Sequence, residues 1–510
     1  MTKYHNFLTP SLTPNSVVDF QLPDLPRRGT SIASQSIVRQ LDIGEWKETE
    51  PLGLVKRIAV DQEKKIVALA DTTHRITLTS FPEPRTPKNS EEGGNAKSNG
   101  AEQEEEEEDE DEDQDLKVQA QFQVKPARKS DSWVGLEFMS RSPPSRELQF
   151  HSGVLSTLSS GIVSLHPSSN PSSSSSTQTQ TGRLPSPLTC AQTISPSQLV
   201  VAGKEVDVSI WDLERVFAKG PVPIGEKAAG KRKKGELEDG EVWRAKNLPN
   251  NHLSLRTPIH HLCLTILPST PGSTTTATST STSIVTGTKS GHVRRYDTRQ
   301  RKPVDGWKVA REGGVGAVQA GLNEHELFFA DTSSLLGSMD LRTGKLLYAY
   351  PSQTSTAHSL LPLAPLSEYT YKKSYSRFSK TAEERRDRVG LVTLSSDATL
   401  RACSTTAPPE ESKNNVTRGE VLGMVGGVGS GGVGYYGSSE MEELEGDAED
   451  EVVGDGEDVA GEGDGDEEEV WDDMAVVEED EGLGSDMDEE DDEESSEDES
   501  PQRKRKGGKR

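Results

Sequence analysis

Residues 284–297 read IVTGTKSGHVRRYD: an apolar strand, a tight polar turn, and a second strand that ends in an aromatic residue and Asp. Similar paired runs along the chain end in Trp211-Asp212, Tyr296-Asp297 and Met339-Asp340. The last two endings lie 43 residues apart, within the period of about 40–45 residues at which the blades of WD-repeat proteins recur. Short runs rich in β-branched residues and bounded by Gly, Pro, Asp or Asn predict strands, and long helical periodicity is absent.

The strands fall into seven groups. The first begins within residues 3–20, and the others centre on 54–81, 133–165, 188–213, 258–297, 315–350 and 357–425. A closed ring of four-stranded blades buries each sheet against its neighbours, so short strands can be stable without a long hydrophobic run. The sequence therefore predicts an all-β fold, a seven-bladed WD-repeat β-propeller over residues 1–437. The exact borders of the first and third blades stay open.

Charge separates the chain into two kinds of segment. The 510 residues carry 57 Lys and Arg against 85 Asp and Glu, a formal net charge of -28. Residues 441–500 hold 33 acidic residues and residues 101–115 hold 12, with no basic residue in either, so the remainder carries +17. Such acidic runs repel themselves and cannot bury enough apolar surface to offset the entropy of ordering. We therefore predict a disordered acidic loop and a disordered acidic tail, residues 438–510.

Low-complexity composition predicts further disordered insertions in the propeller. Together with the acidic loop, they lie near residues 86–115, 167–182, 218–240 and 269–283. No window approaches 18 consecutive apolar residues, and the N-terminus has no apolar segment, so we expect neither a membrane span nor a secretory signal. Three widely spaced cysteines argue against a disulfide framework and for a reducing compartment.

Signatures of catalysis and cofactor binding are weak. The GVGSGG of residues 427–432 fits a dinucleotide-binding motif formally, but no βαβ unit surrounds it. His260, His261 and Cys263 look like a fragment of a metal site, in which strand alternation would put His261 and Cys263 on one face and His260 on the other. No second ligand pair is spaced to close that site. We therefore expect no enzyme, no cofactor, no bound metal and no small-molecule substrate.

One segment carries a resemblance to a known family. Residues 241–260 read EVWRAKNLPNNHLSLRTPIH and follow the IWDLE of residues 210–214. This order of R-A-K-N, an Asn-rich gap and L-x-L-R-x-P resembles the nucleolar WD-repeat proteins of large (60S) ribosomal subunit biogenesis. Supporting matches are RKP at 301–303, SSDATLR at 395–401 and EEVWDDM at 468–474. The resemblance covers about residues 190–425 and the tail motif.

The resemblance implies a seven-bladed propeller with a flexible C-terminal tail, located in the nucleus and nucleolus. It implies a non-enzymatic scaffold on pre-60S ribosomal particles, with ribosomal RNA (rRNA) and assembly factors as partners. It further implies a role in rRNA processing and release by an AAA-type ATPase. The sequence departs from the family pattern at Ser254, where an acidic residue is usual, and at His260, where an aromatic residue is usual. These departures leave the contact chemistry of this loop open.

Candidate binding residues follow from the same segment. Arg244, Lys246, Asn247 and Arg256 lie on or beside a connection between blades, and loops on a rigid scaffold commonly carry binding residues. Lys and Arg can neutralise phosphates, and Arg can also pair with carboxylates. The alternative is that Arg256 or Asn247 only ties the loop to the propeller. Since Arg294 and Arg295 would point to opposite faces of one strand, at most one can join a surface patch.

The C-terminal tail holds two further candidates. Trp471, within the acidic segment 468–474, is a candidate for a linear docking motif whose ring anchors in a partner's pocket. Six basic residues near the end are candidates for nuclear localisation or RNA contact: Arg503, Lys504, Arg505, Lys506, Lys509 and Arg510. The loop KRKK at 231–234 is a second localisation candidate.

Two other functions stay open. The acidic tail also suits a WD-repeat chaperone that binds histones, because acidic tails serve basic partners generally. A substrate adaptor for a ubiquitin ligase is a second alternative, although no sequence feature calls for it. The RAKN…LxLRxP order favours ribosome assembly, and the net charge of +17 outside the acidic blocks suits a surface that meets rRNA. The sequence leaves open which face binds which partner, whether RNA is contacted directly, and what the acidic loop does.

Overall fold

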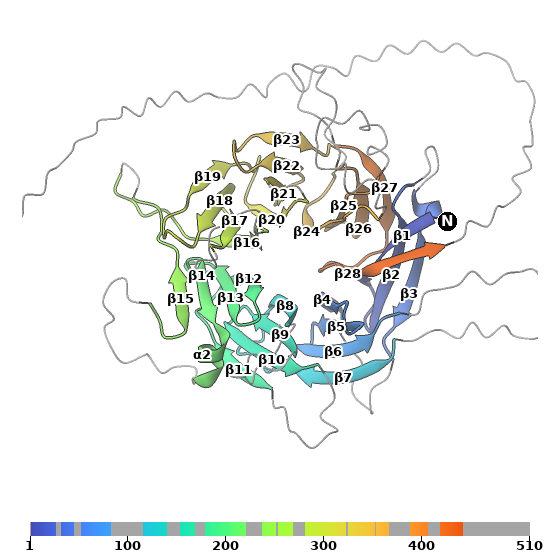
Figure 1. Cartoon of the computed structure of the whole chain (residues 1–510), viewed down its shortest axis with the longest axis horizontal. Coiled ribbons are helices and arrows are strands. Elements are labelled where there is room, and N and C mark those ends of the chain that lie inside the picture. The colour runs from blue at the N-terminus through green and yellow to red at the C-terminus, as the bar shows by residue number, and fades with distance from the viewer. Residues whose placement is uncertain are drawn as a thin grey trace, which may run out of the picture. The chain divides into compact units, whose positions relative to one another are not determined.

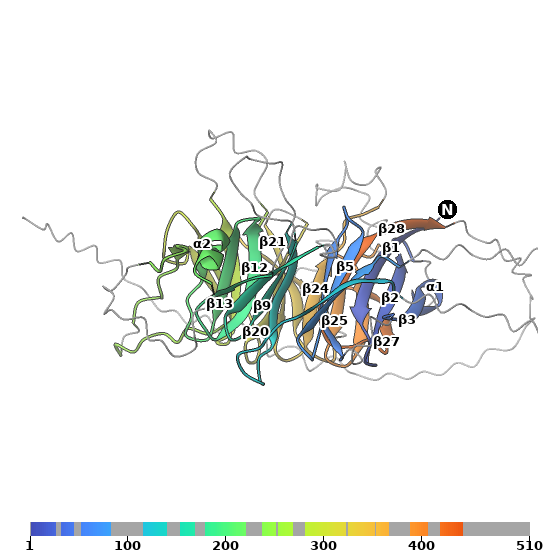
Figure 2. The ribbon, with the colours of Figure 1, turned by 90° about the horizontal axis from the view of Figure 1, so that it is seen from below.

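The computed structural model describes residues 2–26, 32–44, 53–82, 116–139, 153–168, 179–220, 237–250, 253–268, 281–322, 325–351, 353–366, 388–405 and 419–441. Within them, 28 strands form seven four-stranded sheets, accompanied by the short helices α1 (Ile32–Gln35) and α2 (Leu213–Ala218). The sheets stand side by side in a closed ring (Figure 1), and a side view shows their strands running between the two faces of that ring (Figure 2). The chain is a seven-bladed β-propeller.

The blades are named here in chain order. Blade 1 contains β28 (Gly434–Met441), β1 (Thr2–Pro10), β2 (Ser16–Pro23) and β3 (Ile37–Asp42). Blade 2 contains β4 (Val55–Asp61), β5 (Ile66–Asp71), β6 (Arg75–Ser80) and β7 (Val118–Gln123). Blade 3 contains β8 (Trp133–Met139), β9 (Gly153–Leu158), β10 (Ile162–Pro167) and β11 (Gln180–Arg183). Blade 4 contains β12 (Leu188–Ser195), β13 (Gln198–Gly203), β14 (Ser209–Asp212) and β15 (Glu241–Arg244).

The remaining blades follow the same plan. Blade 5 contains β16 (His261–Ile266), β17 (Ser283–Thr288), β18 (His292–Asp297) and β19 (Asp305–Lys308). Blade 6 contains β20 (Val315–Ala320), β21 (Glu326–Asp331), β22 (Leu336–Asp340) and β23 (Leu346–Ala349). Blade 7 contains β24 (Ala357–Pro362), β25 (Leu391–Ser395), β26 (Thr399–Cys403) and β27 (Val421–Gly426). Each of the seven predicted groups of strands falls in a different sheet, so the predicted blade count is confirmed.

The hydrophobic core consists of seven clusters, one at each contact between neighbouring blades. Both faces of every sheet are therefore covered. Trp211 of the Trp-Asp pair that ends β14 is 3% exposed and packs between blades 3 and 4, where its indole N–H donates to the Ser209 hydroxyl over 2.9 Å. Burial of both faces explains why the strands show little apolar–polar alternation along the sequence.

The last strand, β28, closes the ring, and the sequence pattern does not predict this strand. Strand β28 pairs antiparallel with β1, so the C-terminal part of the propeller completes the blade that the N-terminus begins. The predicted boundary at residue 437 falls inside this strand, and Ser438–Met441 belong to the sheet rather than to a tail. Glycines interrupt the segment, and its pairing partner lies more than 400 residues away in the sequence. Neither local pattern nor spacing could therefore identify it.

A buried polar network joins the closing strand to the rest of blade 1. Asp19 on β2 is fully buried and accepts hydrogen bonds from Arg39 Nε on β3 over 2.7 Å and from the Tyr436 hydroxyl on β28 over 2.6 Å. The Tyr436 ring packs edge-on against Phe81 of the blade 2 segment, with centroids 5.3 Å apart. The network connects both ends of the propeller across a single sheet.

The insertions differ from prediction at their edges. Gln180–Gly182 belong to β11, the fourth strand of blade 3, and Ser283 begins β17, so these residues are not part of insertions. The fold needs them because β11 is the outer strand of blade 3 and β17 is the second strand of blade 5. Residues 86–115 and the interiors of the other three insertions lie outside the described residues, as does the chain after Met441.

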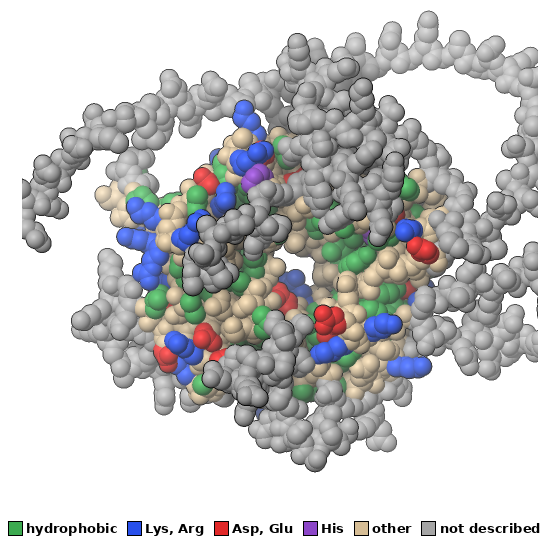
Figure 3. Space-filling model, in the orientation of Figure 1, with side chains coloured by type: hydrophobic (Ala, Val, Ile, Leu, Met, Phe, Trp, Pro, Cys, Tyr) green, Lys and Arg blue, Asp and Glu red, His purple; other side chains and the backbone are tan. Residues whose placement is uncertain are grey.

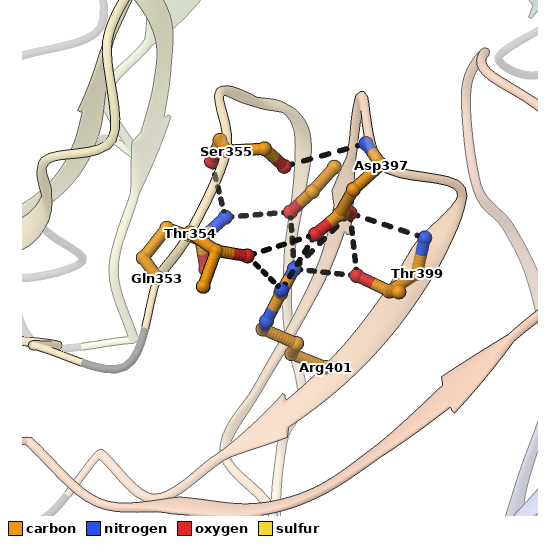
Figure 4. A network of polar contacts seen from close by, with 7 residues as sticks. Gln353, Thr354, Ser355, Asp397, Thr399 and Arg401 are labelled. Atoms are coloured by element: carbon orange, nitrogen blue, oxygen red, sulfur yellow. Dashed lines mark hydrogen bonds and ion pairs between the residues drawn. The ribbon is translucent and has the colours of Figure 1, made fainter.

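A second polar network, built around the buried Arg401, explains the SSDATLR segment of blade 7 (Figure 4). Arg401, 3% exposed at its side chain, donates from Nη2 to Asp397 Oδ2 over 2.7 Å and to the Thr354 hydroxyl over 2.9 Å. Thr354 in turn donates to Asp397 over 3.0 Å, and Gln353 donates to Ser395 over 2.6 Å. Residues 395–401 thus bind the connection that arrives from blade 6.

This network makes stability depend on pH. Burial alone would raise the pKa of Asp397, but hydrogen bonds from Arg401, Thr399 and Thr354 and the charge of Arg401 hold it well below its usual value. A carboxyl with a lowered folded-state pKa stabilises the fold above its unfolded pKa of about 4, and this contribution is lost as the pH falls. We expect Asp397→Asn to lower the free energy of unfolding by about 1–2 kcal/mol at pH 7. Urea titrations should show that difference shrink between about pH 5 and pH 2.

Asp305→Asn is the matched control for this prediction. Asp305 and Arg295 lie 3.9 Å apart with side chains 39% and 33% exposed, and exposed pairs contribute only about 0–1 kcal/mol. A destabilisation of Asp397→Asn that stays the same at every pH would contradict the predicted linkage.

Candidate nucleic-acid interface

Blade 5 and the connection leading to it are strongly basic. Residues 244–311 contain eleven Lys or Arg residues and two acidic residues, Asp297 and Asp305. The basic residues are Arg244, Lys246, Arg256, Lys289, Arg294, Arg295, Arg299, Arg301, Lys302, Lys308 and Arg311. Much of the positive charge outside the acidic blocks is therefore concentrated in one sector of the ring.

Arg244, a predicted binding residue, is engaged within its own blade. It ends β15, and its Nε and Nη2 donate to the two carboxylate oxygens of Glu241, three residues earlier, over 2.5 Å each. The Glu241 side chain is fully buried, whereas the Arg244 side chain is 34% exposed. Because both donors are used by Glu241, we infer that Arg244 has a structural role in blade 4.

Asn247 and Arg256 hold the connection that follows. The Asn247 amide donates to the Thr257 carbonyl over 2.8 Å and closes the loop between these residues. The exposed Arg256 lies 3.6 Å from Glu205. Burial raises the pKa of Asp207, and the charges of Arg256 and Arg244 oppose that rise, so both arginines lie near this carboxylate. Asn247 thus closes the loop on itself, whereas the alternative of a tie to the propeller fits Arg256, because Glu205 lies between β13 and β14 of blade 4.

Lys246 differs from these three residues. Its backbone N–H donates to the Arg301 carbonyl over 2.7 Å, while its side chain is exposed. The structure thereby joins two segments that the sequence singled out separately, RAKN at 244–247 and RKP at 301–303. Arg301 and Lys302 are exposed too, and none of the three cationic side chains forms an ion pair with a described residue. We call Lys246, Arg301 and Lys302 the basic rim.

The basic rim lies at the outer edge of the ring. Lys246 directly follows the outer region of blade 4, and residues 301 and 302 precede β19, the outermost strand of blade 5. In the space-filling view, Lys and Arg side chains gather along this edge, near β15 and β18–β19 (Figure 3). Arg299 is also exposed there, but it pairs with Asp297 over 2.6 Å. A surface of unpaired cations suits the phosphate backbone of a nucleic acid.

Exposed aliphatic side chains lie beside the basic rim. Leu253 and Leu255 are 64% and 59% exposed, and Leu248, Val242 and Val304 are exposed as well. Exposed apolar side chains that form a contiguous patch can mark a contact with another protein. This sector therefore has cationic side chains suited to a nucleic acid and aliphatic side chains suited to another protein. Inspection of the sequence could not have found this group, because exposure is a property of the fold.

Two further sequence predictions concern blade 5. Arg294 and Arg295 do lie on opposite faces: Arg294 is 5% exposed in the contact with blade 4, and the half-exposed Arg295 Nε donates to Ser283. His261 and Cys263 were expected on one face, and this is wrong. A bulge between them in β16 turns His261 toward Tyr296 and Cys263 toward the Val315 carbonyl of blade 6.

The bulge also bears on metal binding. His261 Nδ1 lies 3.1 Å from the Thr286 hydroxyl, and burial lowers the pKa of the imidazole to about 3. Among the described residues, no group of three or more His, Cys, Asp or Glu side chains is placed to hold a metal ion. In the same part of the chain, no helix has the length and apolar character that crossing a membrane requires.

The tail candidates are not placed by the structure. Trp471 and the segment 468–474 lie outside the described residues. The same holds for the KRKK loop at 231–234 and for the basic cluster Arg503, Lys504, Arg505, Lys506, Lys509 and Arg510.

No family model matches the chain. Among solved structures, the chain is similar to Raptor from Chaetomium thermophilum, with 13% sequence identity and a TM-score of 0.43. The match covers 73% of this chain and 24% of the Raptor chain, so the matched region spans about a quarter of that protein's length. A likeness at this level identifies neither a family nor a function.

Proposed function

We propose that the protein is a non-enzymatic assembly factor that acts as a scaffold on nuclear precursors of the large ribosomal subunit. The observation that carries the proposal is the basic rim: Lys246, Arg301 and Lys302 are exposed, unpaired with described residues, and lie where the RAKN and RKP segments meet. These are segments through which the sequence resembles nucleolar WD-repeat proteins of 60S biogenesis. The rim would contact the phosphates of rRNA.

The proposed mechanism is that a rigid ring holds RNA and a protein partner side by side near blade 5. Each blade is covered on both faces by its neighbours, so the ring can hold the basic rim at a constant orientation. RNA bound at Lys246, Arg301 and Lys302 would lie beside an assembly factor bound at Leu253 and Leu255. Such a scaffold supports rRNA processing by positioning, without chemistry of its own.

The chain beyond the propeller completes the proposal. Trp471 would serve as a docking element for other factors, and residues 503–510 would direct the protein to the nucleus and nucleolus. An AAA-type ATPase would release the protein once the particle matures, as the family resemblance implies.

Purification of the tagged full chain from cell extract tests this function. We expect it to recover precursors of large-subunit rRNA together with other assembly factors, measured by RNA sequencing and mass spectrometry. Recovery of histones without rRNA precursors would replace the proposal with a chromatin chaperone. Recovery of cullin-type subunits would replace it with a ubiquitin-ligase adaptor.

A further inference from the structure

The inner strands of six blades share a bulge at their second residue. In each of β4, β8, β12, β16, β20 and β24, pairing with the next strand skips this residue. The skipped residues are Lys56, Val134, Thr189, Leu262, Gly316 and His358. A bulge leaves its extra residue unpaired and changes the direction of the side chain. These six residues occupy equivalent positions near the start of the inner strands, which surround the opening seen in Figure 3. Val134 packs in the core between blades 3 and 4, and Thr189 donates to the His261 carbonyl of blade 5.

The ionisable members of this set lie on one side of the ring. Lys56 belongs to blade 2 and His358 to blade 7, the two blades that flank blade 1. The other four members are uncharged. Among these six positions, the ionisable side chains therefore lie only in blades 2 and 7.

Arg57 adds a charge that no described residue neutralises. It follows Lys56 on β4 and is half-buried, yet its guanidinium forms no hydrogen bond or ion pair with any described residue. Burial lowers the pKa of Arg57, although a guanidinium stays protonated in proteins. Half-buried charged side chains are normally paired. Within the described part of the chain, the Arg57 guanidinium is therefore available to bind an anion.

The same charges reach His358. Burial lowers the pKa of the His358 imidazole, the charges of Arg57 and Lys56 lower it further, and Asp397 opposes them. Asp397 is already held by Arg401 at 2.7 Å and by Thr354 at 3.0 Å. Its carboxylate is thus committed to the blade 7 network, and Lys56 and Arg57 are cations close enough to act on the His358 imidazole.

A glycine-rich loop borders these residues. The GVGSGG segment, residues 427–432, connects β27 to β28, so strands flank it instead of a βαβ unit. Lys56 Nζ lies 3.4 Å from the Ser430 hydroxyl, and a Cβ on Gly431 would stand 2.7 Å from the Lys56 carbonyl oxygen. In the described part of the chain, the N–H groups of Ser430, Gly431 and Gly432 donate to no backbone carbonyl. Successive free N–H groups attract anions.

We propose that this side of the channel mouth binds a phosphate group, held by Lys56, Arg57, His358 and the loop 430–432. Arg57 would bind two phosphate oxygens through its planar fork, and Lys56 would act as a point charge. The ligand class is a small polyphosphate anion, inorganic or organic. The site lies on the inner strands of blades 2 and 7 and is independent of the basic rim and of the proposed function.

Calorimetric titration of the full chain with inorganic tripolyphosphate tests the site. We expect saturable binding at one site, and a loss of affinity of at least about tenfold in both Arg57→Gln and Lys56→Ala. Two control variants remove the same residue types from exposed positions elsewhere: Arg128→Gln and Lys345→Ala. The controls should keep the wild-type affinity. Circular dichroism and urea titrations establish that all four variants fold.

The outcomes separate clearly. Absence of saturable binding to the wild-type chain overturns the site, and so does unchanged affinity in folded Arg57→Gln. Equal losses of affinity in the control variants would show that tripolyphosphate responds only to total charge, which also overturns it. A second titration with inositol hexakisphosphate shows whether an organic polyphosphate is preferred. Recovery of rRNA precursors is measured apart from these titrations, so each proposal can fail without the other.

Discussion

Replacing Asp19 by alanine is expected to lower the free energy of unfolding by about 3–5 kcal/mol, because it leaves a buried guanidinium without its carboxylate. The Arg39 side chain is 9% exposed and donates to Asp19 over 2.7 Å. The same change removes the acceptor of the Tyr436 hydroxyl on the closing strand. Since β28 joins blade 1 by pairing with β1 and its Tyr436 bonds to Asp19 on β2, we expect the destabilisation to fall on ring closure.

Urea titrations of two further variants make this prediction specific. Tyr436→Phe removes one hydrogen bond and should cost about 1–2 kcal/mol. Lys3→Ala is the matched control, because Lys3 and Glu440 pair over 3.1 Å across the same two strands with side chains 40% and 56% exposed. It should cost no more than about 1 kcal/mol. If Asp19→Ala and Lys3→Ala have equal effects, the buried network does not stabilise the closure.

Removing the three charges of the basic rim is expected to weaken RNA binding roughly ten- to hundredfold at physiological salt. The variant is Lys246→Ala, Arg301→Ala and Lys302→Ala. Each side chain is exposed, and the hydrogen bond between Lys246 and Arg301 uses backbone atoms, so the fold should be preserved. For each phosphate that the variant no longer neutralises, the slope of log affinity against log salt should fall by about 0.7–0.9.

Fluorescence anisotropy with a fragment of precursor rRNA, over a series of salt concentrations, measures both quantities. The control removes an identical set of charges from the connection between blades 2 and 3: Lys125→Ala, Arg128→Ala and Lys129→Ala. These residues are exposed or half-exposed as well, and total charge changes equally in both variants. Similar losses of affinity in the two variants would show that RNA responds to overall charge and would remove the assignment of the rim.

Most of the architecture could be predicted because each blade has a local sequence pattern. Pairs of short strands around a polar turn, as in residues 284–297, need only neighbouring residues to form. The closing strand is the exception. Residues 434–441 become a strand through β1, so their structure depends on contacts between the two ends of the propeller. The outer strand β11 was missed for a related reason, since its four residues lie at the end of a Ser-rich run.

The candidate site could be located in the sequence, but its contacts could not be predicted. The RAKN segment does lie in a basic sector, yet Arg244 and Asn247 serve internal contacts, and only the structure shows Glu241 and Thr257 as their partners. The sequence does not mark Arg57 as a binding residue, because the groups that surround an arginine in a strand are known only from the fold. The Gly-rich pattern of residues 427–432 is visible in the sequence, but only the folded structure places this loop beside Lys56.

Three features follow from the residue order alone: the blade count, the division into a basic propeller and acidic segments, and the concentration of candidate binding residues near 244–258. These depend on composition, short-range alternation and period, which are properties of the chain in one dimension. Tertiary structure decided how the ring closes, which charges are neutralised and which stay available. Lys246 and Arg301 are 55 positions apart, and Lys56 and Ser430 are 374 apart. Coulomb energy and hydrogen bonding depend on distance in space, so only folding could pair some of these groups and leave others available to bind a partner.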